Sequence, residues 1–254
     1  MTVVLAIVFG ILIGALLGLV GGGGSILTVP VLVYILDIGV HQATTTSLVI
    51  VGATALFGAV PHFRAGRVDL KTAAIFGGTG IAGAFIGTAL NRQVSGPMIL
   101  MLFGVLMLIV AARMAIGRNQ ANHKPTVTSR SGSRWPELAA GLVVGIMTGF
   151  FGVGGGFLIV PALVILLRFP MRRAVGTSLV IIAIISSAGV IAHLGSGGVD
   201  LSLAAIFIGG GFAGSMLGSL AGGRVNETAL SRGFAGLVVL VGFYLIIRNA
   251  MLLA

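Results

Sequence analysis

Two glycine-rich segments decide the fold of this chain: GGGGSILTVP at residues 21–30 and GVGGGFLIVP at residues 152–161. Each is embedded in apolar sequence that would otherwise form a continuous helix. Glycine in a helix interior costs about 1 kcal/mol relative to alanine, so three or four glycines close together predict a break. We therefore expect the chain to leave the helical conformation at both segments.

The surrounding composition is that of a membrane protein. Of 254 residues, 57% are hydrophobic and 8% are charged, whereas about a quarter of the residues of a soluble domain are charged. The 15 Lys and Arg residues outnumber the 5 Asp and Glu residues, but they lie in short gaps between apolar runs, where loop charges belong. This distribution excludes a basic face for nucleic acid, and the absence of cysteine excludes disulfides and thiolate chemistry.

The two glycine segments belong to an internal repeat. Shifting the sequence against itself by 131 positions places Gly10 on Gly141, without a gap as far as Val94 and Val225. The motif TSLVI occurs at 46–50 and again at 177–181, and VDL occurs at 68–70 and 199–201. Self-similarity of this kind indicates a repeat architecture. We predict a first transmembrane repeat at 1–116, a polar cytoplasmic linker at 117–136 and a second transmembrane repeat at 137–254.

The topology follows from segment lengths and charge. A membrane span needs about 20 helical residues, so the apolar stretches 25–36 and 157–168 are half-helix candidates. If the chain reverses at each glycine break, each repeat has five segments and the second repeat is inverted. All Lys and Arg residues except Arg92 and Arg248 then share one side, as the positive-inside rule requires. The other apolar stretches are 3–20, 43–62, 70–91, 97–116, 137–151, 174–194, 201–221 and 229–253.

The predicted fold class is therefore an all-α integral membrane protein with two inverted-topology repeats of five segments each, every repeat opening with a glycine-broken helical hairpin. Both termini are expected on the external side. Non-helical backbone at membrane depth must be satisfied by surrounding protein or a water-filled cavity. Inverted repeats commonly bind substrate near the midplane, where the repeats meet.

The helix starts after the breaks are candidate anion sites. Unpaired N–H groups make a helix N-terminus electropositive, and Thr-Ser pairs follow in both halves. Two alternatives stay open: the glycines permit tight packing only, and the hydroxyls cap helices or bond to the preceding turn. The candidate substrate-binding residues are Gly22, Gly23, Gly24, Ser25, Thr46, Ser47, Gly154, Gly155, Gly156, Thr177 and Ser178.

Titratable residues also recur in both halves. His62 and His193 end equivalent spans, and proton coupling or gating competes there with a location at the membrane interface without a role in transport. Asp69 and Asp200 precede apolar helices, as N-caps do, and coupling or gating is the alternative for them too. The scattered His and acidic residues have no metal-ligand spacing, so no metal or cofactor is expected.

Small residues at every fourth position, such as Gly10, Gly14 and Gly18, predict close helix packing. This packing could occur within one chain or between the subunits of a homodimer.

The paired blocks GGGGSILTVP and GVGGGFLIVP, each followed by Thr-Ser-Leu-Val and then Gly-x-Val-Asp-Leu, resemble the sulfite exporter TauE/SafE family of bacterial membrane transporters. The resemblance covers nearly the whole chain outside 117–136. It implies a multi-pass permease of the cytoplasmic (inner) membrane that moves small sulfur-containing anions outward, with the glycine blocks and Thr-Ser pairs facing the substrate.

We therefore predict a secondary transporter that exports sulfite, sulfoacetate or a related organosulfonate by alternating access. Its partners would be the small anionic substrate and the lipid bilayer. An anion channel built from the same half-helices, or a permease for another small organic anion, are the alternatives. An enzyme is not expected, because no span contains a catalytic pair of His, Asp or Cys.

Overall fold

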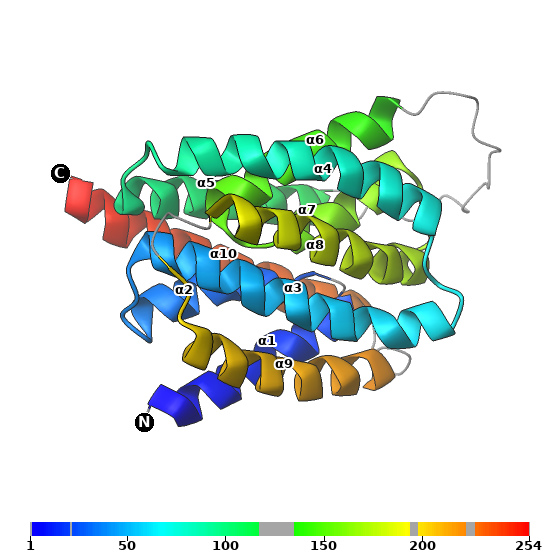
Figure 1. Cartoon of the computed structure of the whole chain (residues 1–254), viewed down its shortest axis with the longest axis horizontal. Coiled ribbons are helices and arrows are strands. Elements are labelled where there is room, and N and C mark those ends of the chain that lie inside the picture. Colours follow the sequence, from blue (N-terminus) through cyan, green and yellow to red (C-terminus); the bar gives the residue numbers. More distant parts are fainter. Residues whose placement is uncertain (1, 21, 117–134, 194–197, 222–226, 254) are drawn as a thin grey trace. The chain divides into compact units, whose positions relative to one another are not determined.

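The structure is a computed structural model that describes residues 2–20, 22–116, 135–193, 198–221 and 227–253. The described residues form ten α-helices and one π-helical turn, with no strand among them (Figure 1). Apart from residues 135 and 136, the predicted linker 117–136 lies outside the described residues. The chain divides into two compact units, and each unit takes helices from both halves of the sequence.

The first unit holds both glycine breaks. Its helices from the first half are α1 (Thr2–Val20), α2 (Ser25–Tyr34), α3 (Val40–Arg64) and α4 (Leu70–Asn91). Those from the second half are α6 (Trp135–Phe151), α7 (Gly156–Pro161) with the π-helical turn Ala162–Leu166, α8 (Met171–His193) and α9 (Leu201–Ala221).

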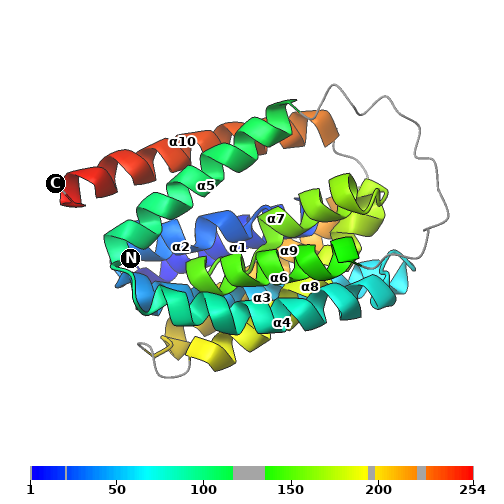
Figure 2. The same cartoon turned by 90° about the horizontal axis from the view of Figure 1, so that it is seen from above.

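The second unit consists of α5 (Gly96–Ile116) and α10 (Glu227–Leu253). These two helices run antiparallel, side by side (Figure 2). Gly104 of α5 lies against the backbone of Gly242 in α10.

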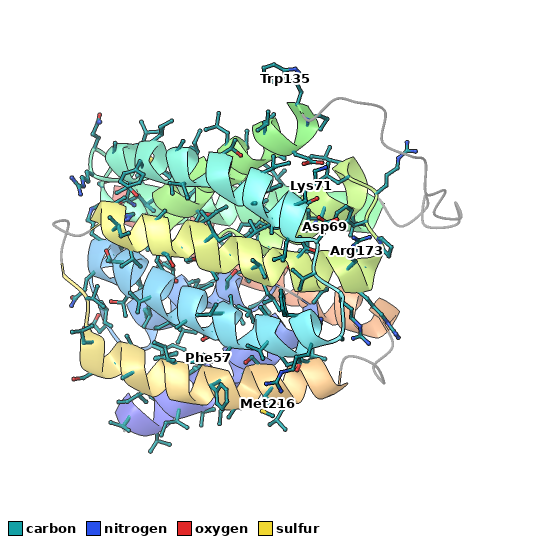
Figure 3. All side chains as sticks on the ribbon, turned by 45° about the vertical axis from the view of Figure 1, so that its right-hand side comes forward. Phe57, Asp69, Lys71, Trp135, Arg173 and Met216 are labelled. Carbon is teal, nitrogen blue, oxygen red and sulfur yellow. The ribbon has the colours of Figure 1, made fainter. Side chains whose placement is uncertain are left out.

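Within the described residues, four helices are long and apolar enough to cross a membrane: Val40–Arg64, Leu70–Asn91, Met171–His193 and Leu201–Ser219. Among the remaining helices, α2 and α7 have only ten and six residues, as the sequence predicts. Large apolar side chains such as Phe57 and Met216 are exposed on α3 and α9 (Figure 3). The prediction of an all-α protein with several membrane-spanning helices is confirmed.

The chain turns back at both glycine breaks. Gly24, at the start of α2, lies against the backbone of Ile13 and Leu17 in α1. Gly155, at the start of α7, lies against Val144 and Thr148 in α6. These contacts are equivalent under the shift of 131 positions, and they bring the residue before α2 back against α1 and the residue before α7 back against α6.

Helices of one half pack on helices of the other. α1 lies along α9 and α4 lies along α6, both pairs in parallel, through small residues: Gly14 contacts Gly211, and Gly145 contacts Gly80. Helices approach this closely only where no side chain intervenes. The small-residue stripes are therefore used within this chain.

α3 and α8 are equivalent in the repeat, yet they run antiparallel (Figure 1). Gly52 of α3 lies against Ser186, while Gly58, further along α3, lies against Leu179, earlier in α8. The helix pairs of the first unit therefore correspond under the repeat: α1 with α9 is equivalent to α6 with α4, and α3 with α8 is equivalent to itself.

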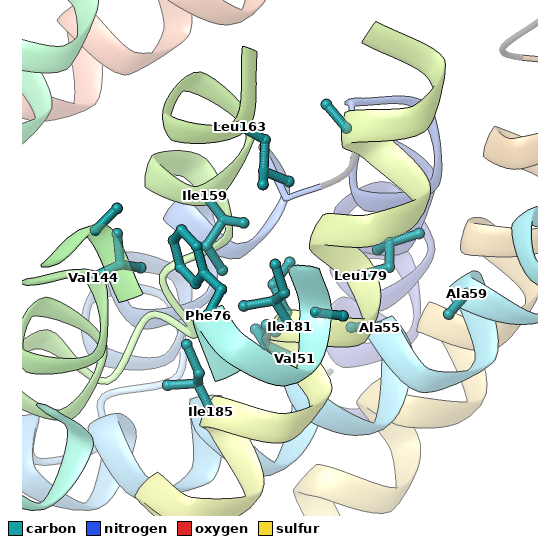
Figure 4. Close-up of a cluster of buried hydrophobic side chains, with 14 of the residues drawn as sticks. Val51, Ala55, Ala59, Phe76, Val144, Ile159, Leu163, Leu179, Ile181 and Ile185 are labelled. Atoms are coloured by element: carbon teal, nitrogen blue, oxygen red, sulfur yellow. The ribbon is translucent and has the colours of Figure 1, made fainter. Parts of the chain in front are cut away.

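A buried apolar core lies where these helices meet. Phe76 of α4 is fully buried, together with Val51 of α3, Ile159 of α7, and Ile181 and Ile185 of α8 (Figure 4). The core includes side chains from both halves, so neither half buries its apolar face by itself.

Candidate functional site

The two glycine breaks meet inside the first unit. A Cβ atom added to Gly156 would lie 2.7 Å from the Cα atom of Gly22, and Gly22 itself has a φ of 145°. Backbone therefore packs directly on backbone, which only glycine permits. The two breaks therefore lie side by side, where the two halves of the sequence meet.

At the first break, the Ser25 hydroxyl is already engaged. Its Oγ donates to the carbonyl oxygen of Gly22 over 2.7 Å, and the side chain is fully buried. A serine hydroxyl has a single proton to donate. In this arrangement Ser25 therefore stabilises the turn and keeps only its lone pairs for a ligand.

The second break has a different backbone. Gly152, Gly154 and Gly155 have φ values of 68°, 70° and 62°, in the left-handed region where a side chain costs about 1–2 kcal/mol. Gly152 lies against Thr44 of α3, and Gly155 lies against the hydroxyl of Thr148. These glycines are required both by conformation and by close packing.

Three buried hydroxyls lie around the second break, and we call them the hydroxyl cluster: Ser47, Thr148 and Ser186. Each side chain is 0% exposed, and none of the three oxygens has a hydrogen-bond partner among the described residues. A Cβ at Gly154 would lie 3.2 Å from the Ser186 Oγ. Thr148 touches the next glycine in the chain, Gly155, so these two hydroxyls flank consecutive glycines.

Ser47 belongs to the same region because of its place on α3. Thr44 and Val51 contact Gly152 and Gly154, and residues three or four positions apart share a helix face. Ser47 lies three residues after Thr44 and four before Val51, so it is on the face of α3 that meets the second break.

The positions equivalent to the hydroxyl cluster under the repeat carry no unsatisfied hydroxyl, and the other buried hydroxyls without a partner among the described residues, Thr28 and Thr54, lie at different positions in the first half. A shift of 131 positions places Thr148 on Leu17 and Ser186 on Ala55. It places Ser47 on Ser178, whose Oγ donates to the Val175 carbonyl oxygen over 2.8 Å. The two breaks therefore have equivalent helices around them, and they differ in the polar side chains that these helices carry.

Thr46 and Thr177 connect the two halves. The Thr177 hydroxyl accepts from the backbone N–H of Asp69 over 3.0 Å, and the Thr46 hydroxyl accepts from the N–H of Asp200 over 3.4 Å. The helices containing these threonines begin at Val40 and Met171, several residues before the apolar stretches begin. The threonines therefore lie inside helices and do not cap them.

The N-cap interpretation of the aspartates is confirmed. Asp69 Oδ1 accepts from the Thr72 N–H, and Asp200 Oδ1 accepts from the Leu203 N–H, both over 2.9 Å. Asp69 Oδ2 also pairs with Arg173 over 3.0 Å (Figure 3).

The two histidines differ in their surroundings. His62 is 7% exposed, and neither ring nitrogen has a hydrogen-bond partner among the described residues. His193 is fully buried, and its Nδ1 lies 3.0 Å from both the Thr88 hydroxyl oxygen and the Gly189 carbonyl oxygen. Because α3 and α8 are antiparallel and each histidine is near the end of its helix, the two rings lie at opposite ends of the unit.

Thr148 and Ser186 were not singled out from the sequence. Both lie within apolar helices, at positions where the other half has leucine or alanine. A search for polar residues that break the internal repeat would have found them. Within the described part of the chain, no group of three or more His, Cys, Asp or Glu side chains is arranged to hold a metal ion.

Comparison with known proteins identifies relatives along almost the full length. The family model described as "Sulfite exporter TauE/SafE" matches residues 6–245. Two proteins of Xylella fastidiosa, strains 9a5c and Temecula1, are each named "Probable membrane transporter protein" and are 37% and 39% identical to this chain, over 94% of it and 93% of each relative. The "Probable membrane transporter protein YunE" of Bacillus subtilis is 27% identical over 97% of this chain and 98% of its own.

No solved structure matches this chain. The relatives are named as transporters and not as enzymes, in agreement with the sequence prediction.

Proposed function

Because this chain belongs to the sulfite exporter TauE/SafE family and is thus a multi-pass membrane transporter, we propose that it exports small sulfur-containing anions. The family description names sulfite, and sulfoacetate or a related organosulfonate are the other proposed substrates. The transport mechanism we propose is alternating access of two inverted repeats around a fixed site.

The observation that carries this proposal is the hydroxyl cluster at the second glycine break. A buried hydroxyl without a hydrogen-bond partner costs about 1–3 kcal/mol, so three of them in one place favour a ligand that supplies partners. No Lys or Arg is among the buried side chains of the described residues. An anion at this place would therefore be held by neutral hydroxyl and backbone donors.

Of the residues expected to bind substrate, those at the breaks are best placed. Gly22, Gly23, Gly24, Gly154, Gly155 and Gly156 are buried where the halves meet, and Ser47 belongs to the hydroxyl cluster. Thr46 and Thr177 would hold in place the loops that contain Asp200 and Asp69. Ser25 and Ser178 would fix local turns of the backbone. Thr148 and Ser186 join the proposed site.

The antiparallel packing of α3 and α8 supports inverted topology. Two equivalent helices that cross the same membrane in opposite directions belong to oppositely oriented repeats. In the first unit, Arg173 and Lys71 lie at the same end of the helices as Asp69 (Figure 3). With the positive-inside rule, this end would be cytoplasmic, in the bacterial inner membrane, and both termini external.

For coupling of transport to protons, His62 and His193 are better candidates than Asp69 and Asp200. Asp69 and Asp200 are engaged as N-caps, whereas His62 and the Nε2 of His193 have no partner among the described residues. A homodimer remains part of the proposal, but its interface would have to differ from the glycine stripes between α1 and α9 and between α4 and α6.

Transport in proteoliposomes tests the function. The full chain should accelerate the exchange of labelled sulfite or sulfoacetate over that in protein-free vesicles, with saturable counterflow. The Ser186→Ala variant should reduce the rate, and Ser178→Ala provides the control on the same helix, because the Ser178 hydroxyl already donates to the Val175 carbonyl oxygen. Equal rates in loaded and protein-free vesicles would refute the substrate assignment, and unitary currents in planar bilayers would indicate a channel.

A further inference from the structure

A second polar group lies about two helical turns from the hydroxyl cluster along α3 and α8, and His193 is its one member with a counterpart of the same residue type, His62, in the repeat. It forms where α4 and α8 end and α3 begins, and we call it the His193 cluster. Its members are His41, Thr88, Asn91, Arg92 and His193.

The hydrogen bonds of His193 define the state of its ring. Nδ1 lies 3.0 Å from the Gly189 carbonyl oxygen, which can only accept, so Nδ1 carries a hydrogen. In the neutral ring, Nε2 is then an acceptor with a free lone pair. Nε2 is buried and has no partner among the described residues, and the side chain is 0% exposed.

Arg92 is fixed beside this ring. Its Nη2 donates to the carbonyl oxygen of Ala192, the residue before His193, over 2.7 Å. A guanidinium has five N–H donors, so one bond positions the group and leaves donors for a ligand. The side chain is exposed, which gives an ion from solution a way to reach it.

His41 is oriented from the other side by Asn91. The Asn91 Nδ2 donates to the Phe150 carbonyl oxygen over 2.6 Å, which places Oδ1 toward His41. The His41 Nδ1 lies 3.1 Å from this Oδ1 and therefore donates to it. Asn91 is fully buried, so it holds the half-buried His41 ring in one orientation.

The charges around His193 are basic. Both Arg92 and His41 are close enough to act electrostatically on its ring. The other titratable residues described on the packed helices α3, α4 and α6, together with Arg172 and Arg173 of α8, lie toward the opposite end of the unit: His62, Arg64, Asp69, Lys71 and Glu137. The acidic residues on the near side are Asp37, before α3, and Asp200, before α9.

We propose that the His193 cluster binds a small oxyanion together with one proton. A proton from solution adds to the Nε2 lone pair of His193, and no other bond is broken. The new Nε2–H and the guanidinium of Arg92 then donate to the anion, with His41 adding positive charge. Since proton and anion stabilise each other, each raises the affinity for the other by the same factor.

The cluster is specific to one end of the molecule. Thr88 corresponds to Ser219, whose hydroxyl donates to the Met216 carbonyl oxygen and not to a histidine. Arg92 corresponds to Gly223 and Asn91 to Gly222. His62 thus lacks all three supporting side chains, and the His62→Gln variant is the matched control for His193→Gln.

Calorimetry on the purified full chain tests the proposal with sulfate, whose charge does not change between about pH 6 and pH 8. We expect sulfate to bind at least tenfold more tightly at the lower pH, with uptake of about one proton for each sulfate in weakly buffered solution. His193→Gln should remove the pH dependence, and His62→Gln should keep it. Arg92→Gln should weaken binding tenfold and retain the pH dependence.

Sulfate binding without proton uptake, or with equal affinity at both pH values, would overturn the proposal without any variant having to fold. The same titration in nanodiscs containing phosphatidylglycerol should give the same affinity. If sulfate no longer binds there, the site holds a lipid phosphate, and the assignment to a free oxyanion is wrong. Ser186→Ala removes the contribution of the proposed transport site to sulfate binding, so pH-dependent binding that persists in this variant belongs to the His193 cluster.

Discussion

The two glycine breaks have the same place in the repeat and different chemistry. At the first, α2 is an α-helix of ten residues, the Ser25 hydroxyl closes the turn, and Leu17 and Ala55 stand at the positions equivalent to Thr148 and Ser186. At the second, three glycines adopt positive φ, and α7 passes after six residues into a π-helical turn. The comparison indicates that repeated residues build the helices and the glycine contacts, while Thr148 and Ser186, which depart from the repeat, add buried hydroxyls to the second break.

The largest effect is expected from side chains added at the breaks. Gly22→Ala would place a Cβ against the Gly156 backbone, and Gly155→Ala would place one against the Thr148 hydroxyl at a φ of 62°. Both variants should lose transport almost completely, and the yield of folded protein in detergent chromatography should fall, because the backbone cannot move apart without opening the core.

Gly78→Ala and Gly209→Ala are the matched controls, since these equivalent helical glycines have no atom within 4 Å of an added Cβ. Alanine there should leave yield and transport unchanged or slightly improved. If Gly22→Ala or Gly155→Ala behaves like these controls, backbone contact between the breaks is not required.

The second-largest effect is expected on substrate affinity, when hydroxyls that only the second break has are removed. Thr148→Val and Ser186→Ala should weaken substrate affinity about tenfold to a hundredfold, as expected for the loss of a hydrogen bond of about 1.5–3 kcal/mol to a charged group. Ser178→Ala should change the affinity little. The measurement is the concentration dependence of anion uptake into proteoliposomes.

Thermal unfolding distinguishes binding from structure in the same variants. Since neither hydroxyl has a partner among the described residues, removing one should leave the unfolding temperature without substrate unchanged or higher. A clear fall in that temperature with unchanged affinity would assign the hydroxyl cluster to folding.

A smaller effect concerns the two hydrogen bonds between the halves. Thr177→Val leaves the Asp69 N–H without its 3.0 Å acceptor, and Thr46→Val does the same for Asp200 at 3.4 Å. We expect a destabilisation of about 1 kcal/mol for Thr177→Val and less for Thr46→Val, measured as shifts in unfolding temperature. Equal shifts would show that the two connections are energetically symmetric.

The smallest effect is expected at the ion pair. Arg173 pairs with Asp69, but the residue equivalent to Arg173 in the first half is Gln42. Arg173→Gln therefore makes the two halves alike at this position. Because the arginine side chain is 52% exposed, the expected loss of stability is below about 1 kcal/mol and should disappear in high salt. A larger loss, independent of salt, would mean that the pair holds the two halves together.

Much of the frame is predictable from the sequence. The helices, the short α2 and α7, and the aspartate caps follow from apolar length, glycine content and position. The halves do not form separate units, however. α5 and α10, from different halves, form one unit and the remaining helices the other. Helix partners depend on side-chain packing between distant segments, which periodicity within one segment does not report.

The candidate site is predictable in place and only partly in composition. The glycine breaks lie in the region of the proposed site, but the repeated Thr46 and Thr177 hydroxyls accept from backbone N–H groups, while Thr148 and Ser186 have no hydrogen-bond partner among the described residues. The sequence of an apolar helix does not distinguish a threonine whose hydroxyl bonds to the backbone from one whose hydroxyl faces a binding site. Only the three-dimensional contacts separate the two cases.

The most direct test of inverted repeats around the breaks uses single cysteines, since the chain has none. Asp37 and Arg168 are equivalent exposed positions, as are Lys71 and Ser202. With a membrane-impermeant maleimide on intact cells, cysteines at 37 and 202 should be labelled, whereas those at 71 and 168 should react only after permeabilisation. Labelling of 37 and 168 from the same side of the membrane would contradict inversion and, with it, the proposed alternating-access mechanism.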